Sequence, residues 1–205
     1  MNIQNIIFDW SGTLCDDLIT TYQASMLIFK KLGKTPLSLK EYRDEFTLPY
    51  MIFWNKYFPN LTKEEQDKLS NEMLLKVNAP KLYPGVKKVI QNLDSDNIEM
   101  IIISSQHYDK LITECVDYGI SKYFRQVNGS VYDKTKMIRD CLAQNNFNPE
   151  KTMFVGDMTH DIDAGKKAGV ITVGLSWGYQ HKDRLVAFKP DYLISDINEL
   201  EGLLR

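Results

Sequence analysis

A short apolar run near the start of the chain ends abruptly in a carboxylate and a turn. Residues Ile6–Phe8 are followed by Asp9 and, three and four positions later, by Gly12 and Thr13. An apolar run of this length, bounded by turn residues, predicts a buried strand of a parallel sheet. Such a strand places Asp9 at the mouth of the sheet, where it can act as a nucleophile beside turn amides that favour an anion.

Similar apolar runs recur along the chain and alternate with helical stretches. The expected strands are Ile3–Phe8, Ile98–Ile103, Arg125–Asn128, Thr152–Val155 and Val170–Leu175. The expected helices between the later strands are Gly85–Leu93, Tyr108–Tyr118, Lys134–Asn145 and Thr159–Ala168. This alternation predicts an α/β fold built on a doubly wound, Rossmann-like parallel sheet. The last residues, Asn198–Arg205, are expected to form a closing helix.

Residues 16–80 interrupt this alternation, because they contain no convincing strand. Their amphipathic helical stretches include Leu18–Leu32 and Thr62–Val77, and the second begins with the capping-box spacing of Thr62 and Glu65. The sequence therefore predicts an α/β core domain of residues 1–15 and 81–205 and an inserted all-helical cap domain of residues 16–80. The aromatic stretch Tyr50–Phe58 is interpreted as the hydrophobic core of this cap domain. Asp16 and Asp17 are expected to cap its first helix.

Charge and composition exclude several classes of function. A formal net charge of -2 gives no long-range attraction to nucleic acid. No apolar stretch approaches the ~20 residues that a membrane-spanning helix needs, and no signal-peptide pattern begins the chain. Three cysteines in no metal-ligand spacing fit a reducing compartment. We therefore expect a cytoplasmic protein, monomeric or homodimeric, without a membrane or nucleic-acid partner.

Polar residues follow the predicted strands, at the edge of the sheet where ligands bind in open α/β folds. They supply a nucleophile, hydroxyls, a cation and further carboxylates, in the order Asp9, Ser104, Ser105, Lys134, Gly156, Asp157 and Asp161. Phosphoryl transfer needs these groups, because the transferred group requires a nucleophile, donors for its oxygens and a Mg²⁺ site. The sequence therefore predicts a site for a small phosphorylated metabolite.

Four motifs, in this order, resemble those of the haloacid dehalogenase superfamily of aspartate-nucleophile phosphohydrolases. They are Asp9-Trp10-Ser11-Gly12-Thr13, Ser104, Lys134 and Gly156-Asp157-Met158-Thr159-His160-Asp161. The segment from Gly174 to Tyr179, followed by Pro190 and Asp191, looks like the phosphoglycolate phosphatase branch of that superfamily. The resemblance covers nearly the whole chain, with the helical insertion where the family has a helical cap. It implies a Mg²⁺-dependent phosphatase.

The resemblance also implies a role for each motif residue. Asp9 would attack phosphorus and form an aspartyl-phosphate, while Ser104 would donate a hydrogen bond to a phosphoryl oxygen. The implied Mg²⁺ ligands are Asp9, the backbone carbonyl of Ser11, Asp157 and Asp161, the last directly or through water. The other residues expected to contact the substrate are Gly12, Thr13, Ser105 and Lys56. For the phosphate-binding cation, the Lys-x-x-aliphatic pattern favours Lys134 over Lys136.

Ser11 departs from the family pattern. The family's phosphatases carry a second Asp here, which protonates the leaving oxygen and then activates water. A serine hydroxyl does not titrate near pH 7, and general acid–base catalysis contributes about 10²–10⁴-fold in rate. The sequence therefore predicts a slow phosphatase that is biased toward good leaving groups or helped by an acid from the substrate or the cap. If Ser11 instead positions a water adequately, the rate is ordinary.

Two alternative functions stay open. Trp10 and the small residue at position 11 also resemble phosphonoacetaldehyde hydrolase, a C–P bond hydrolase that needs a lysine of the cap for a Schiff base, and Lys56 is the candidate. The region of the third motif lacks the Arg-Pro pattern of that enzyme. The chain could also be a catalytically weak phosphoryl-binding or regulatory protein. His107 and His160 are expected to face solvent.

Overall fold

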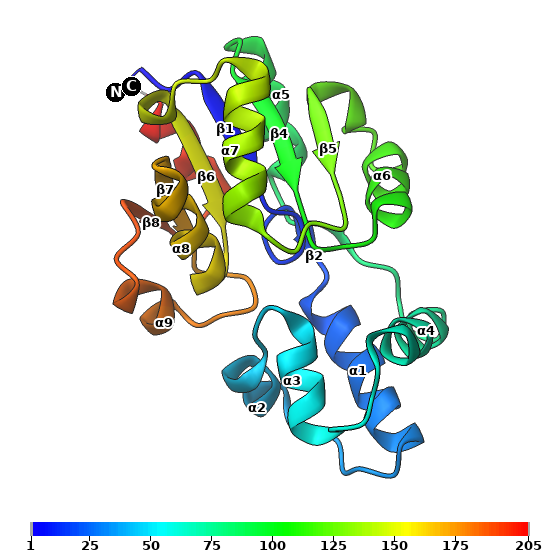
Figure 1. Cartoon of the computed structure of the whole chain (residues 1–205). Helices are drawn as coiled ribbons and strands as arrows, with labels where there is room; N and C mark the ends of the chain where they lie inside the picture. Colours follow the sequence, from blue (N-terminus) through cyan, green and yellow to red (C-terminus); the bar gives the residue numbers. More distant parts are fainter. Residues whose placement is uncertain (1, 205) are drawn as a thin grey trace. The chain divides into compact units, whose positions relative to one another are not determined.

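The computed structural model of the protein describes residues 2–204, which form two compact units (Figure 1). Of the described residues, 2–16 and 81–204 form an α/β unit, and Asp17–Pro80 form a helical unit. The predicted boundary lies one residue earlier, before Asp16. The difference arises because β2 (Cys15–Asp16) and β3 (Lys81–Leu82) pair in a small antiparallel sheet that keeps Asp16 opposite Lys81.

The α/β unit is built on a six-stranded parallel sheet in the order β5-β4-β1-β6-β7-β8. Its strands are β1 (Asn5–Phe8), β4 (Glu99–Ile103), β5 (Gln126–Asn128), β6 (Thr152–Gly156), β7 (Ile171–Leu175) and β8 (Tyr192–Ile194). Starting from β1, the chain adds β4 and β5 on one side and β6, β7 and β8 on the other. This order is that of a doubly wound sheet, and it confirms the predicted fold class.

Helices cover both faces of this sheet. They are α5 (Val86–Ser95), α6 (Tyr108–Asp117), α7 (Lys134–Asn145), α8 (Thr159–Ala168) and α9 (Lys182–Ala187), with 3₁₀ helices η1 (Ser121–Tyr123), η2 (Pro149–Lys151) and η3 (Ile197–Leu203). In Figure 1, α7 and α8 lie in front of the sheet and α5 lies behind it. Ile7 of β1 belongs to the buried cluster of Ile138 on α7, whereas Ile6 and Phe8 belong to the cluster of Val89 on α5. Burial on both faces explains why the central strands β1 and β4 are largely apolar.

Most predicted elements are confirmed to within two residues at each end, and α7 and α8 match residue for residue. The short strands β2, β3 and β8 were not expected, because two or three residues are too few for a hydrophobic period. The expected closing helix is instead the 3₁₀ helix η3. It begins earlier, because Asp196 and Glu199 form a capping box at its start, and Arg205 lies outside the described residues.

The helical unit consists of α1 (Leu18–Lys31), α2 (Leu39–Glu45), α3 (Tyr50–Tyr57) and α4 (Lys63–Leu74). The predicted capping box of Thr62 and Glu65 is present at the start of α4. The helix stops before its predicted end at Val77, and the chain leaves through Pro80, before which helical backbone is disfavoured. Asp17 occupies the N-cap position of α1 but makes no side-chain capping hydrogen bond, so its predicted capping role is wrong.

Aromatic side chains fill the interior of the helical unit. The ring of Phe29 on α1 lies 5.8 Å from that of Trp54 on α3, and Phe53 on α3 lies 5.4 Å from Tyr42 on α2. All four side chains are buried. The aromatic stretch Tyr50–Phe58 therefore supplies the core of this unit, as interpreted from the sequence, and large rings stabilise it through burial and edge contacts.

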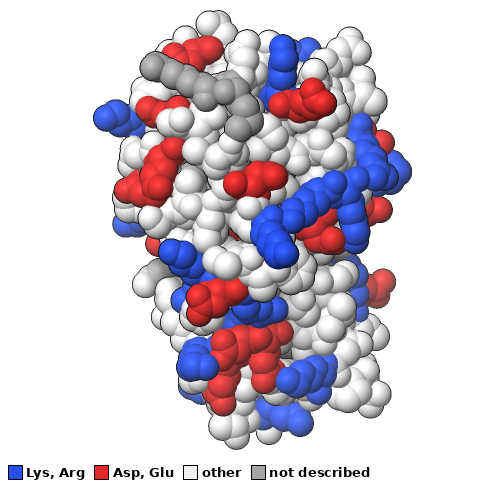
Figure 2. All heavy atoms as spheres, turned by 90° about the vertical axis from the view of Figure 1, so that its left-hand side faces the viewer, with Lys and Arg blue, Asp and Glu red and all other residues white. Residues whose placement is uncertain are grey.

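Acidic and basic side chains are interspersed over the face shown in Figure 2, in keeping with the net charge of -2. Within residues 2–204, no helix combines the length and the apolar character needed to cross a membrane. The three cysteines are buried thiols without a disulfide. The cytoplasmic location and the oligomeric state stay predictions.

Candidate active site

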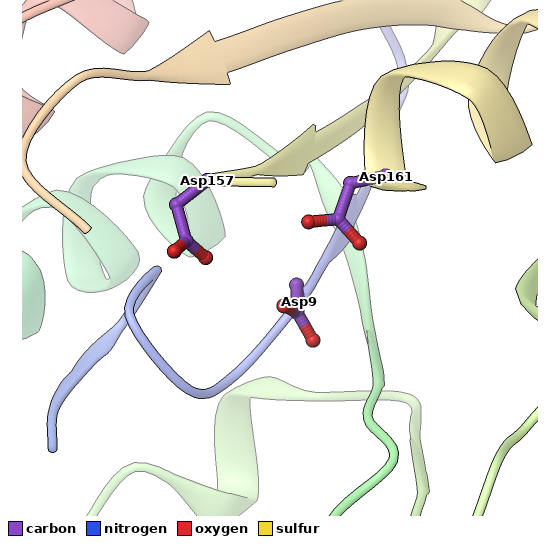
Figure 3. A group of neighbouring side chains, drawn as sticks. All are labelled: Asp9, Asp157 and Asp161. Carbon is purple, nitrogen blue, oxygen red and sulfur yellow. The ribbon is translucent and has the colours of Figure 1, made fainter. Parts of the chain in front are cut away.

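Three buried aspartates converge at the carboxyl edge of the parallel sheet (Figure 3). Asp9 follows β1, Asp157 follows β6 and Asp161 lies in the first turn of α8. One carboxylate oxygen of each lies within 4.8 Å of the other two. Asp9, the most accessible of the three, is only 4% exposed. Within residues 2–204, this is the one cluster of acidic, histidine or cysteine side chains with such spacing.

The register of the sheet brings these aspartates together. Phe8 of β1 lies opposite Val155 of β6, so the residues after both strands emerge side by side. The backbone N–H of Asp9 then donates to the carbonyl of Val155 at 2.9 Å and extends the pairing into the site. Gly156 lets α8 turn back closely, because a Cβ at this position would collide with the side chain of Asp161.

Asp157 is held from two sides. The hydroxyl of Thr13 donates to Asp157 Oδ1 at 2.9 Å, and the backbone N–H of Tyr179 donates to Oδ2 at 2.7 Å. A Cβ at Gly12, where φ is +72°, or at Gly178 would overlap this carboxylate. The contact from Tyr179 was not expected, although the sequence pattern marks the segment after β7. β7 ends at the same edge of the sheet as β6, but the pattern does not show which group of the following segment contacts Asp157.

Lys134, the first residue of α7, supplies the cation of the cluster. Its Nζ lies 2.9 Å from Asp9 Oδ1 and 2.6 Å from Asp161 Oδ1, and its side chain is 1% exposed. Lys136 instead points to solvent with 71% of its side chain exposed and pairs with Asp140 on the same helix. The structure therefore brings Lys134 into the site and leaves Lys136 on the surface.

The buried charges of the cluster do not balance, because one ammonium faces three carboxylates. Burial raises the pKa of Asp9 from 3.8 to about 7, although the ammonium of Lys134 opposes the rise. Burial, together with repulsion by Asp9 and Asp161, raises the pKa of Asp157 well above its ordinary value. Burial alone would lower the pKa of Lys134, but Asp161 and Asp9 outweigh it and raise that pKa. Such excess negative charge, on oxygen donors, suits a divalent cation.

The remaining predicted residues of the α/β unit lie at the ends of neighbouring strands. Ser104 follows β4, is buried, and accepts a hydrogen bond at Oγ from the backbone N–H of Gln106 at 3.1 Å. Ser105 and Ser11 are half-buried. In the turn after β1, the N–H of Gly12 donates to the carbonyl of Cys15 at 2.9 Å. The structure thus gathers the candidates of all four motifs at one edge of the sheet.

Lys56 and the two histidines have other surroundings. Lys56 lies on α3 of the helical unit, where its exposed ammonium pairs with Glu45 at 2.7 Å. His107 is exposed at the start of α6, as expected. The expectation that His160 faces solvent is wrong. The residue is half-buried, and burial lowers the pKa of its imidazole.

Comparisons with known proteins agree with this geometry. A sequence model of haloacid dehalogenase-like hydrolases matches residues 6–175. A phosphoglycolate phosphatase of Synechococcus elongatus is 26% identical over 204 residues, which cover 97% of this chain and 95% of that protein. Pyrophosphatase PpaX of Listeria innocua is 27% identical, with 99% and 97% covered. The solved structure of a haloacid dehalogenase-like hydrolase from Streptococcus pneumoniae gives a TM-score of 0.86 at 21% identity and covers 100% of this chain and 99% of its own.

Proposed function

Because the chain belongs to the haloacid dehalogenase-like hydrolase family, we propose that it is a Mg²⁺-dependent phosphatase that hydrolyses a small phosphorylated metabolite through Asp9. The observation that carries this proposal is the buried contact of Lys134 with Asp9 beside Asp157 and Asp161. Similarity to relatives named phosphoglycolate phosphatase and pyrophosphatase supports a phosphoryl substrate.

The proposed reaction has two displacements at phosphorus. A carboxylate oxygen of Asp9 forms a bond to phosphorus as the bond to the leaving oxygen breaks, which gives an aspartyl-phosphate. Water then attacks phosphorus, the bond to Asp9 breaks, and inorganic phosphate leaves with the free carboxylate restored. Two easier steps replace one difficult step. Asp9 attacks only when ionised, and the ammonium of Lys134 favours that form against the effect of burial.

The aspartate cluster fits Mg²⁺ in its chemistry, because it offers several oxygen donors and a net negative charge in a buried place. The ion would be held by Asp9, Asp157, Asp161 and the backbone carbonyl of Ser11. When bound, it would supply positive charge to the phosphoryl oxygens. The chain prepares this site itself, since Thr13 and the backbone of Tyr179 orient Asp157.

Mg²⁺ should raise the unfolding temperature more at about pH 8 than at about pH 5.5, because protons and the cation compete for the same carboxylates. The pKa of Asp9 is raised from 3.8 to about 7. Between pH 3.8 and about 7, Asp9 is therefore protonated in the folded protein but ionised in the unfolded chain. The stability of the metal-free protein should fall as pH rises through this range.

Thermal unfolding with and without MgCl₂ at the two pH values checks this expectation, with Asp157→Asn as the control that lacks a ligand. An equal effect of Mg²⁺ at both pH values, or an undiminished effect in the control, would contradict the assignment of the cation to these carboxylates.

Ser11 points to the class of substrate. Without a carboxyl group at this position, the leaving oxygen has no proton donor in the motif, so substrates with good leaving groups should react best. Aryl and acyl phosphates and phosphoanhydrides are of this kind, whereas alkyl phosphates are not. This assignment rests on Ser11 alone, and it predicts a strong dependence of kcat/KM on the leaving group.

Ser11→Asp should raise kcat/KM for an alkyl phosphate by about 10²-fold, because it restores general acid–base catalysis. For an aryl phosphate the gain in kcat/KM should be much smaller, because kcat/KM reports formation of the aspartyl-phosphate and an aryl group leaves without a proton donor. Ser11→Asn is the matched control, since it has nearly the shape of the Asp variant but no titratable group. Steady-state assays of the three proteins on both substrates check the prediction, and an unchanged rate on the alkyl phosphate after Ser11→Asp would refute it.

A screen of phosphorylated small molecules tests the proposed function itself. Inorganic phosphate release is measured with Mg²⁺ for phosphoglycolate, pyrophosphate and an aryl phosphate, with the Asp9→Asn protein as background. Release above that background from at least one compound is expected, and none from any would reject the phosphatase assignment. Acetaldehyde release from phosphonoacetaldehyde tests the C–P alternative.

A further inference from the structure

Glu114 on α6 accepts hydrogen bonds from two loops that are distant in sequence. Its Oε2 atom accepts one from the indole N–H of Trp10 at 2.9 Å and one from the side-chain amide of Gln106 at 2.7 Å. The side chain of Glu114 is only 13% exposed, and Trp10 is fully buried. Both hydrogen bonds are accepted by a carboxylate oxygen, so they are charge-assisted and stronger than bonds between neutral groups.

Each donor adjoins a residue of the proposed reaction. Trp10 follows Asp9, and its carbonyl accepts hydrogen bonds from the N–H groups of Leu14 at 2.9 Å and Cys15 at 3.0 Å, which close the turn after β1. Gln106 lies two residues after Ser104, and its backbone N–H donates to Ser104 Oγ at 3.1 Å. One carboxylate oxygen therefore joins the turn that carries Asp9 to the loop that carries Ser104.

The sheet alone does not make this connection. β1 and β4 pair in register up to Phe8 and Ile102, and beyond these residues the two segments leave the ladder. The ring of Trp10 also stacks on Tyr118 at the end of α6, with centroids 6.1 Å apart. The indole hydrogen bond of Trp10 thus goes to α6 and its ring stacks at the end of that helix, and Glu114 also accepts a hydrogen bond from the loop after β4.

We propose that Glu114 is a positioning residue for the phosphatase reaction. It sets the turn of Asp9 and the loop of Ser104 at a fixed separation, so that the nucleophile and the hydroxyl donor meet the same phosphoryl group. This inference rests on the proposed function. A misplacement of about 1 Å in such a pair lowers rates by about 10²-fold. Loss of the two hydrogen bonds that Glu114 accepts should therefore lower kcat while the protein stays folded.

Glu114→Leu should lower kcat by about tenfold or more, with KM within about threefold of the wild-type value, because alignment rather than binding is lost. Glu114→Gln keeps an oxygen that can accept both hydrogen bonds, so it should restore most of the rate. Lys110→Gln is the control on the same helix, since Lys110 lies 3.7 Å from the other oxygen of Glu114 and is more exposed. Its kcat should equal that of the wild type.

The indole N–H of Trp10 gives a readout that does not depend on turnover. Its proton NMR signal is identified by its loss in Trp10→Phe, a variant that keeps an aromatic ring against Tyr118. The signal should lie downfield in the wild type, move upfield in Glu114→Leu and move less in Glu114→Gln. If Glu114→Leu does not fold, Trp10→Phe tests the same bond, and it should lower kcat several-fold.

The outcomes separate this inference from the proposed function. If the proposed function is wrong, the wild type and Lys110→Gln will both show no turnover. This inference would be overturned by an active wild type whose Glu114→Leu and Trp10→Phe variants keep its kcat, or by an indole signal that does not move in Glu114→Leu. A combined Trp10→Phe and Glu114→Leu variant should be no slower than Glu114→Leu, and a multiplied loss would also overturn the inference.

Discussion

Asp9→Asn should lower phosphatase activity by about 10⁴-fold or more, because the amide cannot form the acyl-phosphate bond that the proposed reaction requires. The same change should not unfold the protein. Burial raises the pKa of Asp9 to about 7, so at higher pH the ionised side chain destabilises the metal-free folded state. An uncharged residue here should leave the metal-free protein at least as stable as the wild type at about pH 8.

Two measurements on the same sample check this prediction: phosphate release from an aryl phosphate with Mg²⁺, and the unfolding temperature without Mg²⁺. Lost activity with unchanged or raised stability is the expected pair of results. An Asp9→Asn protein that keeps a tenth or more of the wild-type kcat would show that Asp9 is not the nucleophile. Deamidation back to Asp is controlled by mass spectrometry of the purified protein.

Lys134→Met should lower kcat by about 10³-fold, because a preorganised cation at the reacting group is lost. It should also destabilise the metal-free protein by about 3–5 kcal/mol, since Asp9 and Asp161 would stay buried without their partner. Lys136→Met is the matched control. It makes the same chemical change two residues along the same helix and removes only an exposed pair with Asp140, so both kcat and the unfolding temperature should stay at wild-type values.

Urea unfolding and steady-state kinetics of the two methionine variants decide between the two lysines. If Lys136→Met lost the activity and Lys134→Met kept it, the cation would be misassigned. If both variants kept it, the reaction would need no lysine from the start of α7.

The sheet and the position of the site could be predicted because each depends on short-range patterns. Strands buried on both faces leave continuous apolar runs, as at Ile6–Phe8, and in open α/β sheets the residues after such strands gather at one edge. The preference for Lys134 over Lys136 comes from the family resemblance, and the structure adds a local reason for the position of Lys134. Ile138 lies four residues after Lys134, on the same helical face, and belongs to the core.

Features that depend on tertiary packing could not be predicted in this way. Glu114 lies in no motif, and its role appears only when α6 meets the turn after β1. The hydrogen bond from the backbone N–H of Tyr179 to Asp157 comes from the loop after another strand, β7. His160 was expected at an exposed helix start, yet tertiary packing leaves it half-buried. Local pattern carries no information about such neighbours.

Rapid-quench analysis of a single turnover tests the central claim most directly. Excess protein is mixed with Mg²⁺ and an acyl or aryl phosphate that is labelled in its phosphoryl group. The mixture is quenched in acid, and mass spectrometry identifies the labelled residue. Because Ser11 cannot take a proton from the attacking water, breakdown of the phosphorylated protein should be slow enough for it to accumulate. The account predicts label on Asp9 that hydroxylamine removes. Phosphate release with no labelled protein at any time, or label on Ser11 or Ser104, would contradict it.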